Sequence, residues 1–175
     1  MTKPFKSTPN KSHLLEDGRI IWESRSPAVV GSVILYTTKL EPYILLSERG
    51  PGCPDEVGKF CLPCGYLDWD EYGLSGACRE VWEETGVMLG STWLKSDSPW
   101  LTNTNKESAR QNISIFYLFK KFLSDGESFP EVSNANCEPD EVGDIKWVSL
   151  NEAIKMDLAF GHAKRISQLK DRLYA

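Results

Sequence analysis

The sequence predicts a single α/β domain, in which a mixed set of strands is flanked by a central helix and a C-terminal helix. Three observations lead to this prediction. Short apolar runs rich in β-branched residues alternate with turn residues along most of the chain, which is typical of strands. Residues 71–85 and 151–172 instead repeat their apolar residues at helical spacing. The length of 175 residues fits one domain better than two.

Seven segments are predicted to be strands, because each is short, apolar and bounded by turn residues. They cover residues 19–22, 28–36, 42–47, 60–62, 92–94, 113–122 and 145–150. Asp17 and Gly18 form the turn before the first strand, and Pro63 stops the fourth. Residues 1–12 are largely polar and are expected to be a flexible N-terminus, which leaves residues 13–175 as one domain.

Two helices are predicted beside these strands. The first spans residues 71–85, where Asp70 is expected to cap the N-terminus and Gly86 to follow the C-terminus. Its inward stripe would consist of Leu74, Ala77, Cys78, Val81 and Thr85. The second helix runs from Asn151 to about Arg172, and its many basic residues are interpreted as a solvated face.

Composition and charge restrict the possible partners. The 41% of hydrophobic residues, including 11% of aromatic residues in the chain, fits a folded domain and argues against general disorder. The net charge of -5 argues against long RNA or DNA as a partner, although a bound cation could still attract small phosphorylated molecules. No apolar run is long enough to cross a bilayer, and none follows the basic N-terminus. A cytoplasmic protein without a membrane partner is therefore expected.

The five cysteines include a C-x-x-C pair, Cys61 and Cys64. A zinc site would need two further ligands, and the chain has only His13 and His162, which form no second pair. A redox pair would need a thioredoxin-like βαβ context, which the sequence does not indicate. Two small residues in a turn after a strand are the favoured interpretation, with zinc or redox chemistry as the alternative.

The central helix carries three glutamates, Glu80, Glu83 and Glu84, at positions i, i+3 and i+4. At 100° per residue they fall within an arc of about 100°, away from the apolar stripe. Their mutual repulsion indicates that something positive lies over them, and Arg79 can neutralise part of the charge from one turn before Glu83. Grouped carboxylates are also ligands that Mg²⁺ or Mn²⁺ prefers. An ordinary acidic helix face is the alternative.

A longer pattern surrounds these glutamates. Gly65 is followed after five residues by Glu71, and after seven more by the block from Arg79 to Val87, which reads REVWEETGV. Its seven fixed identities would coincide by chance on the order of once in a billion starting positions. The pattern resembles the complete Nudix box of the Nudix hydrolase family, and the likeness extends over about residues 25–170. Cys64 departs from it, since many members have a second glycine there.

The resemblance implies a Nudix-like α/β/α sandwich with a mixed sheet. The box would form a loop–helix–loop that binds Mg²⁺ or Mn²⁺ beneath a pyrophosphate, and the metal would polarise the phosphate and activate water. The implied metal ligands are the Gly65 carbonyl, Glu80, Glu83 and Glu84. Arg79 would orient the glutamates, and Glu71 would support the loop.

The catalytic base varies within this family, and three acidic residues compete for the role here. Glu80 is one, and the loop before the last strand offers Glu138 and Glu141. Glu141 is preferred, because it lies six residues before Trp147. A solvated loop acid is the alternative for either loop residue.

Substrate contacts are expected outside the box. Arg49, at the end of an aliphatic strand, is placed where members of the family often touch a substrate phosphate; a solvated arginine is the alternative. Arg110 could contact substrate from the loop at about 103–111. The loop at about 124–140 is also long enough to act as a lid or a specificity loop.

The family hydrolyses nucleoside diphosphates linked to another moiety, and the box does not determine that moiety. Residues 158–163 look similar to a segment of the ADP-ribose pyrophosphatase-like branch, which favours ADP-ribose or a nucleotide sugar. A (d)NTP pyrophosphohydrolase that releases NMP and PPi is one alternative. A non-catalytic ligand sensor of the same fold is another, disfavoured by the intact box. A homodimer is possible, since many relatives with an N-terminal extension dimerise through it.

Overall fold

The computed structural model describes residues 11–22, 27–37, 41–104 and 112–174, and it contains two sheets and two helical regions. The small sheet pairs β1 (Ser12–Leu14) with β2 (Ile20–Trp22). The main sheet contains β3 (Pro27–Tyr36), β4 (Tyr43–Arg49), β5 (Phe60–Cys61), β6 (Cys64–Tyr66), β7 (Leu94–Lys95), β8 (Leu101–Thr104), β9 (Ile113–Phe122) and β10 (Val142–Ser149). The helices are α1 (Gly73–Thr85), α2 (Leu150–Ala153), the short 3₁₀ helix η1 (Ala159–Gly161) and α3 (His162–Leu173). Within the described ranges, no helix is long and apolar enough to cross a membrane.

The main sheet is mixed, as predicted. Its strand order is β10-β4-β3-β9-β7, with β5 beside β4, β6 beside β3 and β8 beside β9. β3 and β9 run parallel over their whole lengths, and the other pairs are antiparallel. The long apolar run of β3 is explained by this central place, because a strand covered on both faces has no solvent side.

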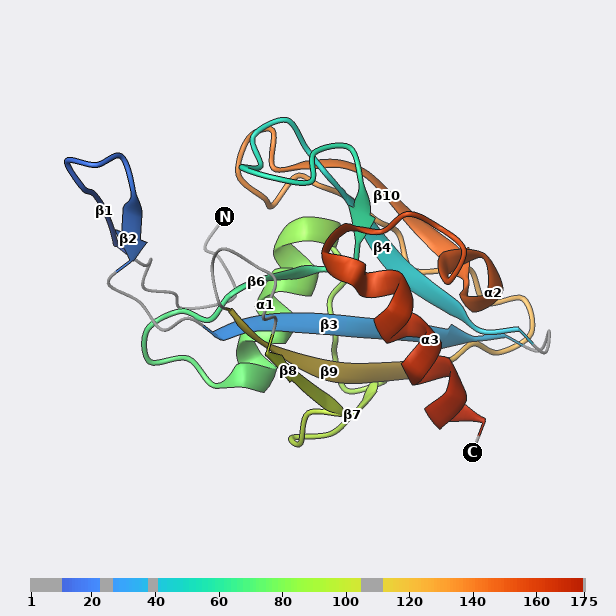
Figure 1. Cartoon of the computed structure of the whole chain (residues 1–175). Coiled ribbons are helices and arrows are strands. Elements are labelled where there is room, and N and C mark those ends of the chain that lie inside the picture. Colours follow the sequence, from blue (N-terminus) through green and yellow to red (C-terminus); the bar gives the residue numbers. More distant parts are fainter. Residues whose placement is uncertain (1–10, 23–26, 38–40, 105–111, 175) are drawn as a thin grey trace.

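The helices lie on opposite faces of the sheet, which gives the predicted α/β/α sandwich (Figure 1). Alternate residues of β3 serve the two cores: Val29 and Val33 pack with α1, while Val30 and Ile34 pack with α3. Gly31 allows the close approach of α1, since a Cβ there would lie 2.3 Å from Val81 Cγ2. α1 thus sits tightly against the central strand and its position is well defined.

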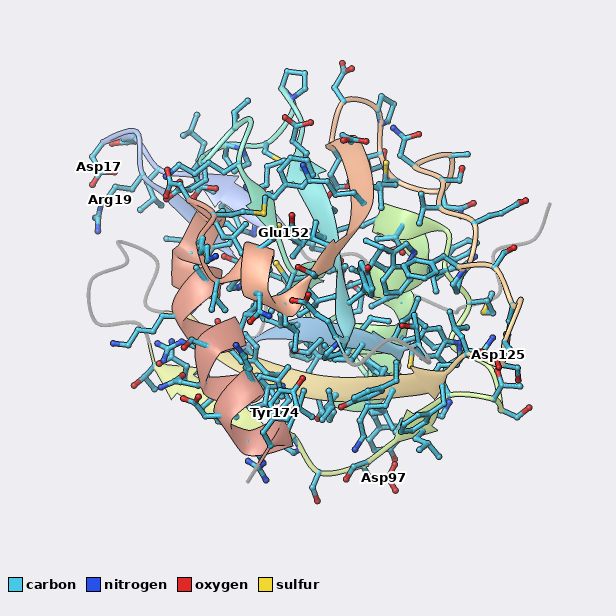
Figure 2. All side chains as sticks on the ribbon, turned by 90° about the vertical axis from the view of Figure 1, so that its right-hand side faces the viewer. Asp17, Arg19, Asp97, Asp125, Glu152 and Tyr174 are labelled. Atoms are coloured by element: carbon cyan, nitrogen blue, oxygen red, sulfur yellow. The ribbon has the colours of Figure 1, made fainter. Side chains whose placement is uncertain are left out.

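Six of the predicted strands are confirmed with small shifts at their ends, whereas the strand predicted at 92–94 shares only Leu94 with β7. Three strands were missed. β1, β6 and β8 are only three or four residues long, and β1 and β8 are mostly exposed, so their sequences carry little apolar pattern. The tip of the β1–β2 hairpin carries an exposed ion pair between Asp17 and Arg19 (Figure 2). Residues 1–10 of the predicted flexible terminus lie outside the described residues, and Ser12 already belongs to β1.

The predicted N-cap of the first helix is wrong, whereas its stripe and its end are confirmed. Tyr72 is the N-cap and makes no side-chain capping bond, and Asp70 has a left-handed backbone with φ 63°. The reason is Glu71, whose carboxylate accepts the Asp68 N–H at 3.2 Å and thereby holds the preceding residues in a turn. Gly86 follows the helix with φ 72°, as predicted for a helix-terminating glycine.

The predicted continuous C-terminal helix is also wrong. Ser149 caps the short α2 by accepting the Glu152 N–H. α2 ends at Ala153, and a turn follows in which Ile154 still has a right-handed helical backbone. Phe160 and Gly161 both have positive φ, so α3 begins only at His162. The apolar spacing was correct, because Ala153, Ile166 and Leu169 are fully buried. Two helical pieces with the right spacing therefore looked like one in the sequence.

Candidate active site

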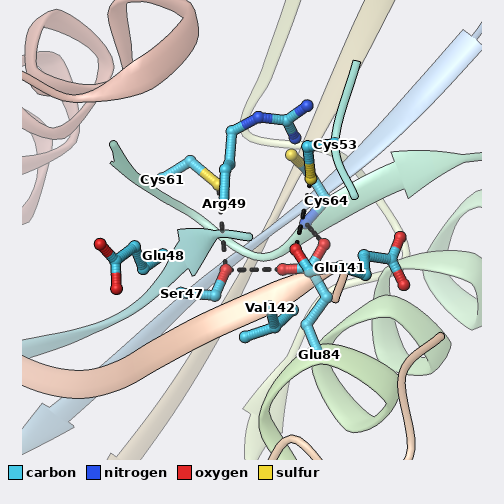
Figure 3. A pocket seen from close by; sticks show the side chains of 9 residues that line it. All are labelled: Ser47, Glu48, Arg49, Cys53, Cys61, Cys64, Glu84, Glu141 and Val142. Atoms are coloured by element: carbon cyan, nitrogen blue, oxygen red, sulfur yellow. Dashed lines mark hydrogen bonds between the residues drawn. The ribbon is translucent and has the colours of Figure 1, made fainter. Parts of the chain in front are cut away.

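A pocket opens where β4 separates from β3. The two strands pair directly only at Ile34–Ile44 and Leu35–Tyr43. Towards the start of β3 and the end of β4, the two strands no longer pair with each other. There β6 pairs with β3 and β5 pairs with β4, so these two short strands fill the gap. The pocket at this place is drawn in Figure 3. Its lining consists of Ser47, Glu48, Arg49, Cys53, Cys61, Cys64, Glu84, Glu141 and Val142.

The glutamate face of α1 is turned into the fold. Glu80 and Glu84 are only 8% and 7% exposed, which excludes an ordinary solvated acidic face for these two. Glu84 points into the pocket, where its carboxylate accepts hydrogen bonds from Ser47 Oγ at 2.6 Å and from the Cys64 N–H at 3.2 Å (Figure 3). Burial raises the pKa of Glu80 to about 8 and the pKa of Glu84 well above its ordinary value.

Arg79 holds the other carboxylates. Its guanidinium donates to Glu71 at 3.0 Å, to Glu80 at 2.6 Å and to Glu83 at 3.0 Å, and also to the Tyr66 carbonyl at 3.0 Å. The side chain is almost fully buried, so these charge-assisted bonds are shielded from water. The predicted pairing of Arg79 with Glu83 is present, and Glu71 joins the loop before α1 to the same guanidinium.

The residues present fit a hard divalent cation. Three carboxylates and the carbonyl of Gly65 offer only oxygen, and two of the carboxylates are buried with raised pKa values that a cation would lower. Gly65 touches this group directly, since a Cβ there would lie 2.4 Å from Glu80 Oε2. As they stand, no three His, Cys, Asp or Glu side chains of the described residues are arranged to hold a metal. In this structure, Arg79 and Ser47 donate hydrogen bonds to the carboxylate oxygens.

Arg49 and Glu141 both line the pocket, because the end of β4 lies beside the start of β10. Arg49 ends β4 and is paired with Val142, which begins β10. The following glycines pack on the opposite loop: a Cβ on Gly50 would lie 2.2 Å from the Asp140 carbonyl oxygen. The Arg49 guanidinium donates to the Asp55 carboxylate at 2.7 Å, which fixes its direction.

The other predicted residues are placed differently. Arg110 lies outside the described residues. Glu138 is exposed and does not line the pocket, but its N–H donates to the Glu141 carboxylate at 3.2 Å. The loop at 124–140 closes over the end of α1, where the Ser133 N–H donates to the Thr85 carbonyl. Of the two loop acids, Glu141 is therefore the one at the site.

Cys61 and Cys64 were predicted in a turn after a strand; instead Cys61 ends β5 and Cys64 begins β6, and only Leu62 and Pro63 lie between the two strands. Both cysteines line the pocket, and all five cysteines are free thiols. Sequence reasoning missed Ser47, which lies beneath Glu84. The alternation of β4 carried a signal for it, because Ser47 and Arg49 are two residues apart and share one side of the strand.

Comparison with known proteins agrees with this geometry. The family model of the NUDIX domain matches residues 25–169. The NUDIX domain of Shewanella oneidensis NrtR, solved with ADP ribose, has 23% identity and a TM-score of 0.63, covering 86% of this chain and 90% of that chain. The Nudix hydrolase RenU from M. smegmatis has 15% identity and a TM-score of 0.64, covering 94% of each chain. A C. elegans Ap4A hydrolase has 19% identity and a TM-score of 0.60, covering 84% of this chain and 98% of that chain. A search of curated proteins found no match.

The family match covers most of the chain and includes every residue of the pocket. The chain belongs to the Nudix hydrolase family, whose members are enzymes that hydrolyse phosphoanhydride bonds. Its reaction class is therefore pyrophosphate hydrolysis, and its family generally uses divalent metals.

Proposed function

We propose that this chain hydrolyses the pyrophosphate of a nucleoside diphosphate linked to another moiety, with ADP-ribose or a nucleotide sugar as the favoured substrate. The observation that carries the proposal is one pocket lined by Glu84 of α1, by Arg49 and by Glu141. Pyrophosphate hydrolysis needs a carboxylate that can bind a metal, a positive charge near the phosphate and an acid that can act as a base. Glu84, Arg49 and Glu141 would supply these three groups. The likeness to a NUDIX domain solved with ADP ribose supports this choice of substrate.

The roles follow from the positions of the side chains. Gly65 O, Glu80, Glu83 and Glu84 would hold Mg²⁺ or Mn²⁺, which supplies charge neutralisation of the phosphate and an activated water when bound. Arg79 keeps the glutamates together, and Glu71 holds the loop that contains Gly65 in place. Arg49 binds a substrate phosphate, and Glu141 takes the proton from the attacking water.

A screen of phosphate-containing products tests the proposal. Purified protein is incubated with ADP-ribose, nucleotide sugars, NADH and (d)NTPs, each with Mg²⁺ and with Mn²⁺. AMP and ribose 5-phosphate from ADP-ribose are the expected products, and EDTA should stop their release. NMP with PPi from (d)NTPs would support the alternative substrate class. No turnover of any substrate would favour a non-catalytic ligand sensor.

Glu141→Gln is expected to lower kcat by about a hundredfold or more and to remove the acidic limb of the pH–rate profile, because the variant lacks the base. The profile of kcat from pH 5 to pH 10 is the measurement. Glu138→Gln is the matched control from the same loop and should keep the limb. An unchanged profile in Glu141→Gln would assign the base to Glu80.

The cytoplasmic location and a homodimer remain predictions of the sequence. A small nucleotide is the expected partner, because the pocket carries one arginine and a set of acids and no extended basic surface. Long nucleic acid is disfavoured by the net charge of -5. Light scattering of the purified chain measures the oligomeric state directly.

A further inference from the structure

Phe160 has an unusual backbone for its residue type. Its φ of 57° and ψ of 17° lie in the left-handed region, which is unfavourable for a residue other than glycine. The next residue, Gly161, has φ 67° and is a glycine, the residue type that adopts this conformation without strain. Position 160 has the same conformation but carries a phenylalanine. A phenylalanine in this conformation points to a use for its ring.

The ring is exposed although residues on both sides of it along the chain are buried. Leu158, Ala159 and His162 are at most 4% exposed, whereas Phe160 is 39% exposed. The segment is therefore anchored on both sides, and the left-handed backbone directs one aromatic side chain outward. Exposed aromatic rings on rigid segments are common binding elements, because little conformational entropy is lost when they are covered.

Two contacts hold the ring beside the pocket. The Arg49 guanidinium carbon lies 4.7 Å from the Phe160 ring centroid, in a cation–π contact. The His162 ring packs edge-on with its centroid 5.7 Å away. His162 is itself fixed, because its Nδ1 accepts the Leu62 N–H at 3.0 Å. The exposed ring is thus a preformed surface next to the arginine that lines the pocket.

We propose that Phe160 is a specificity-determining residue that stacks on the aromatic base of the substrate. The inference rests on the proposed function, since it names the part of the nucleotide that lies beyond Arg49. A nucleotide presents phosphates and a flat base within one molecule, and the chain presents a guanidinium that lies over one face of a partly exposed ring. Base–aromatic stacking strengthens binding of a nucleotide by about tenfold or more per base, which is enough to separate nucleotides from phosphates without a base.

Binding of two matched probes tests this role without any turnover. α,β-Methylene-ADP and methylenediphosphonate carry the same non-hydrolysable diphosphonate, but only the first has a base. In calorimetric titrations with Mg²⁺, Phe160→Leu should weaken binding of α,β-methylene-ADP about tenfold. Binding of methylenediphosphonate by Phe160→Leu should change less than about threefold. Phe160→Trp keeps an aromatic ring and should bind α,β-methylene-ADP about as tightly as the wild type. Because turnover is not measured, absence of hydrolysis leaves this test intact.

Controls separate stacking from structural effects. Phe122→Leu changes an exposed aromatic ring that stacks on Tyr36 and does not line the pocket, and both affinities should stay as in the wild type. Arg49→Ala should weaken both probes, because it removes a phosphate contact. Equal weakening of both probes in Phe160→Leu would mean that the ring acts only through Arg49, and unchanged binding would mean that it does not act. Either result would overturn the proposal.

Discussion

Replacing Glu84 with glutamine is expected to lower kcat by about a thousandfold or more while the protein stays folded. Glutamine has the same shape but no charge, and it can still accept one of the two hydrogen bonds that reach Glu84. Steady-state rates with Mg²⁺ on the substrate found by the screen give the measurement. Glu131→Gln, an exposed acid on the loop at 124–140, is the control and should keep its activity. Full activity in Glu84→Gln would refute the assignment of this residue.

The same substitution should change how the stability of the metal-free protein depends on pH. Burial raises the pKa of Glu84 well above 4.5 and the pKa of Glu80 to about 8. Both carboxyls therefore bind protons more tightly in the folded state, so the free energy of unfolding falls as the pH rises from about 5 to about 8. Glutamine cannot ionise, and Glu84→Gln should lose less stability over this range. Urea unfolding in EDTA at several pH values measures the difference, and equal pH dependence would contradict it.

Arg79→Ala is expected to have the largest effect on stability, about 3–5 kcal/mol in the free energy of unfolding. The substitution leaves Glu71, Glu80 and Glu83 close together without the guanidinium that joins them. Urea unfolding at pH 8 measures the loss, and Mg²⁺ should restore part of it because the same carboxylates would bind the cation.

Two variants make the Arg79 result interpretable. Arg79→Lys keeps the charge but cannot reach several carboxylates with one planar group, so an intermediate loss of stability is expected. Arg19→Ala removes the exposed pair with Asp17 and should leave the free energy of unfolding nearly unchanged, because water screens that pair. A loss in Arg79→Ala as small as that in Arg19→Ala would show that the buried network does not stabilise the fold.

Local patterns explain why α1 could be predicted closely. Ala77 and Val81 lie one turn apart and are fully buried, and Gly86 ends the helix in the left-handed conformation that favours glycine. Asp70 shows the limit of the same reasoning. It is a good capping residue by type, but the contacts of Glu71 hold the chain in a turn and delay the start of the helix.

The spacing from Gly65 to Val87 was sufficient by itself to indicate the family, because it is set by the geometry of one loop and one helix. The sequence also determined the reaction class and the residues available for a metal. Only the tertiary structure decided how these residues are used. Ser47 lies under Glu84 because β4 separates from β3 there, and Phe160 lies beside Arg49 although 110 residues separate them along the chain. Such contacts depend on strand register and on the packing of distant segments, which spacing along one helix cannot encode.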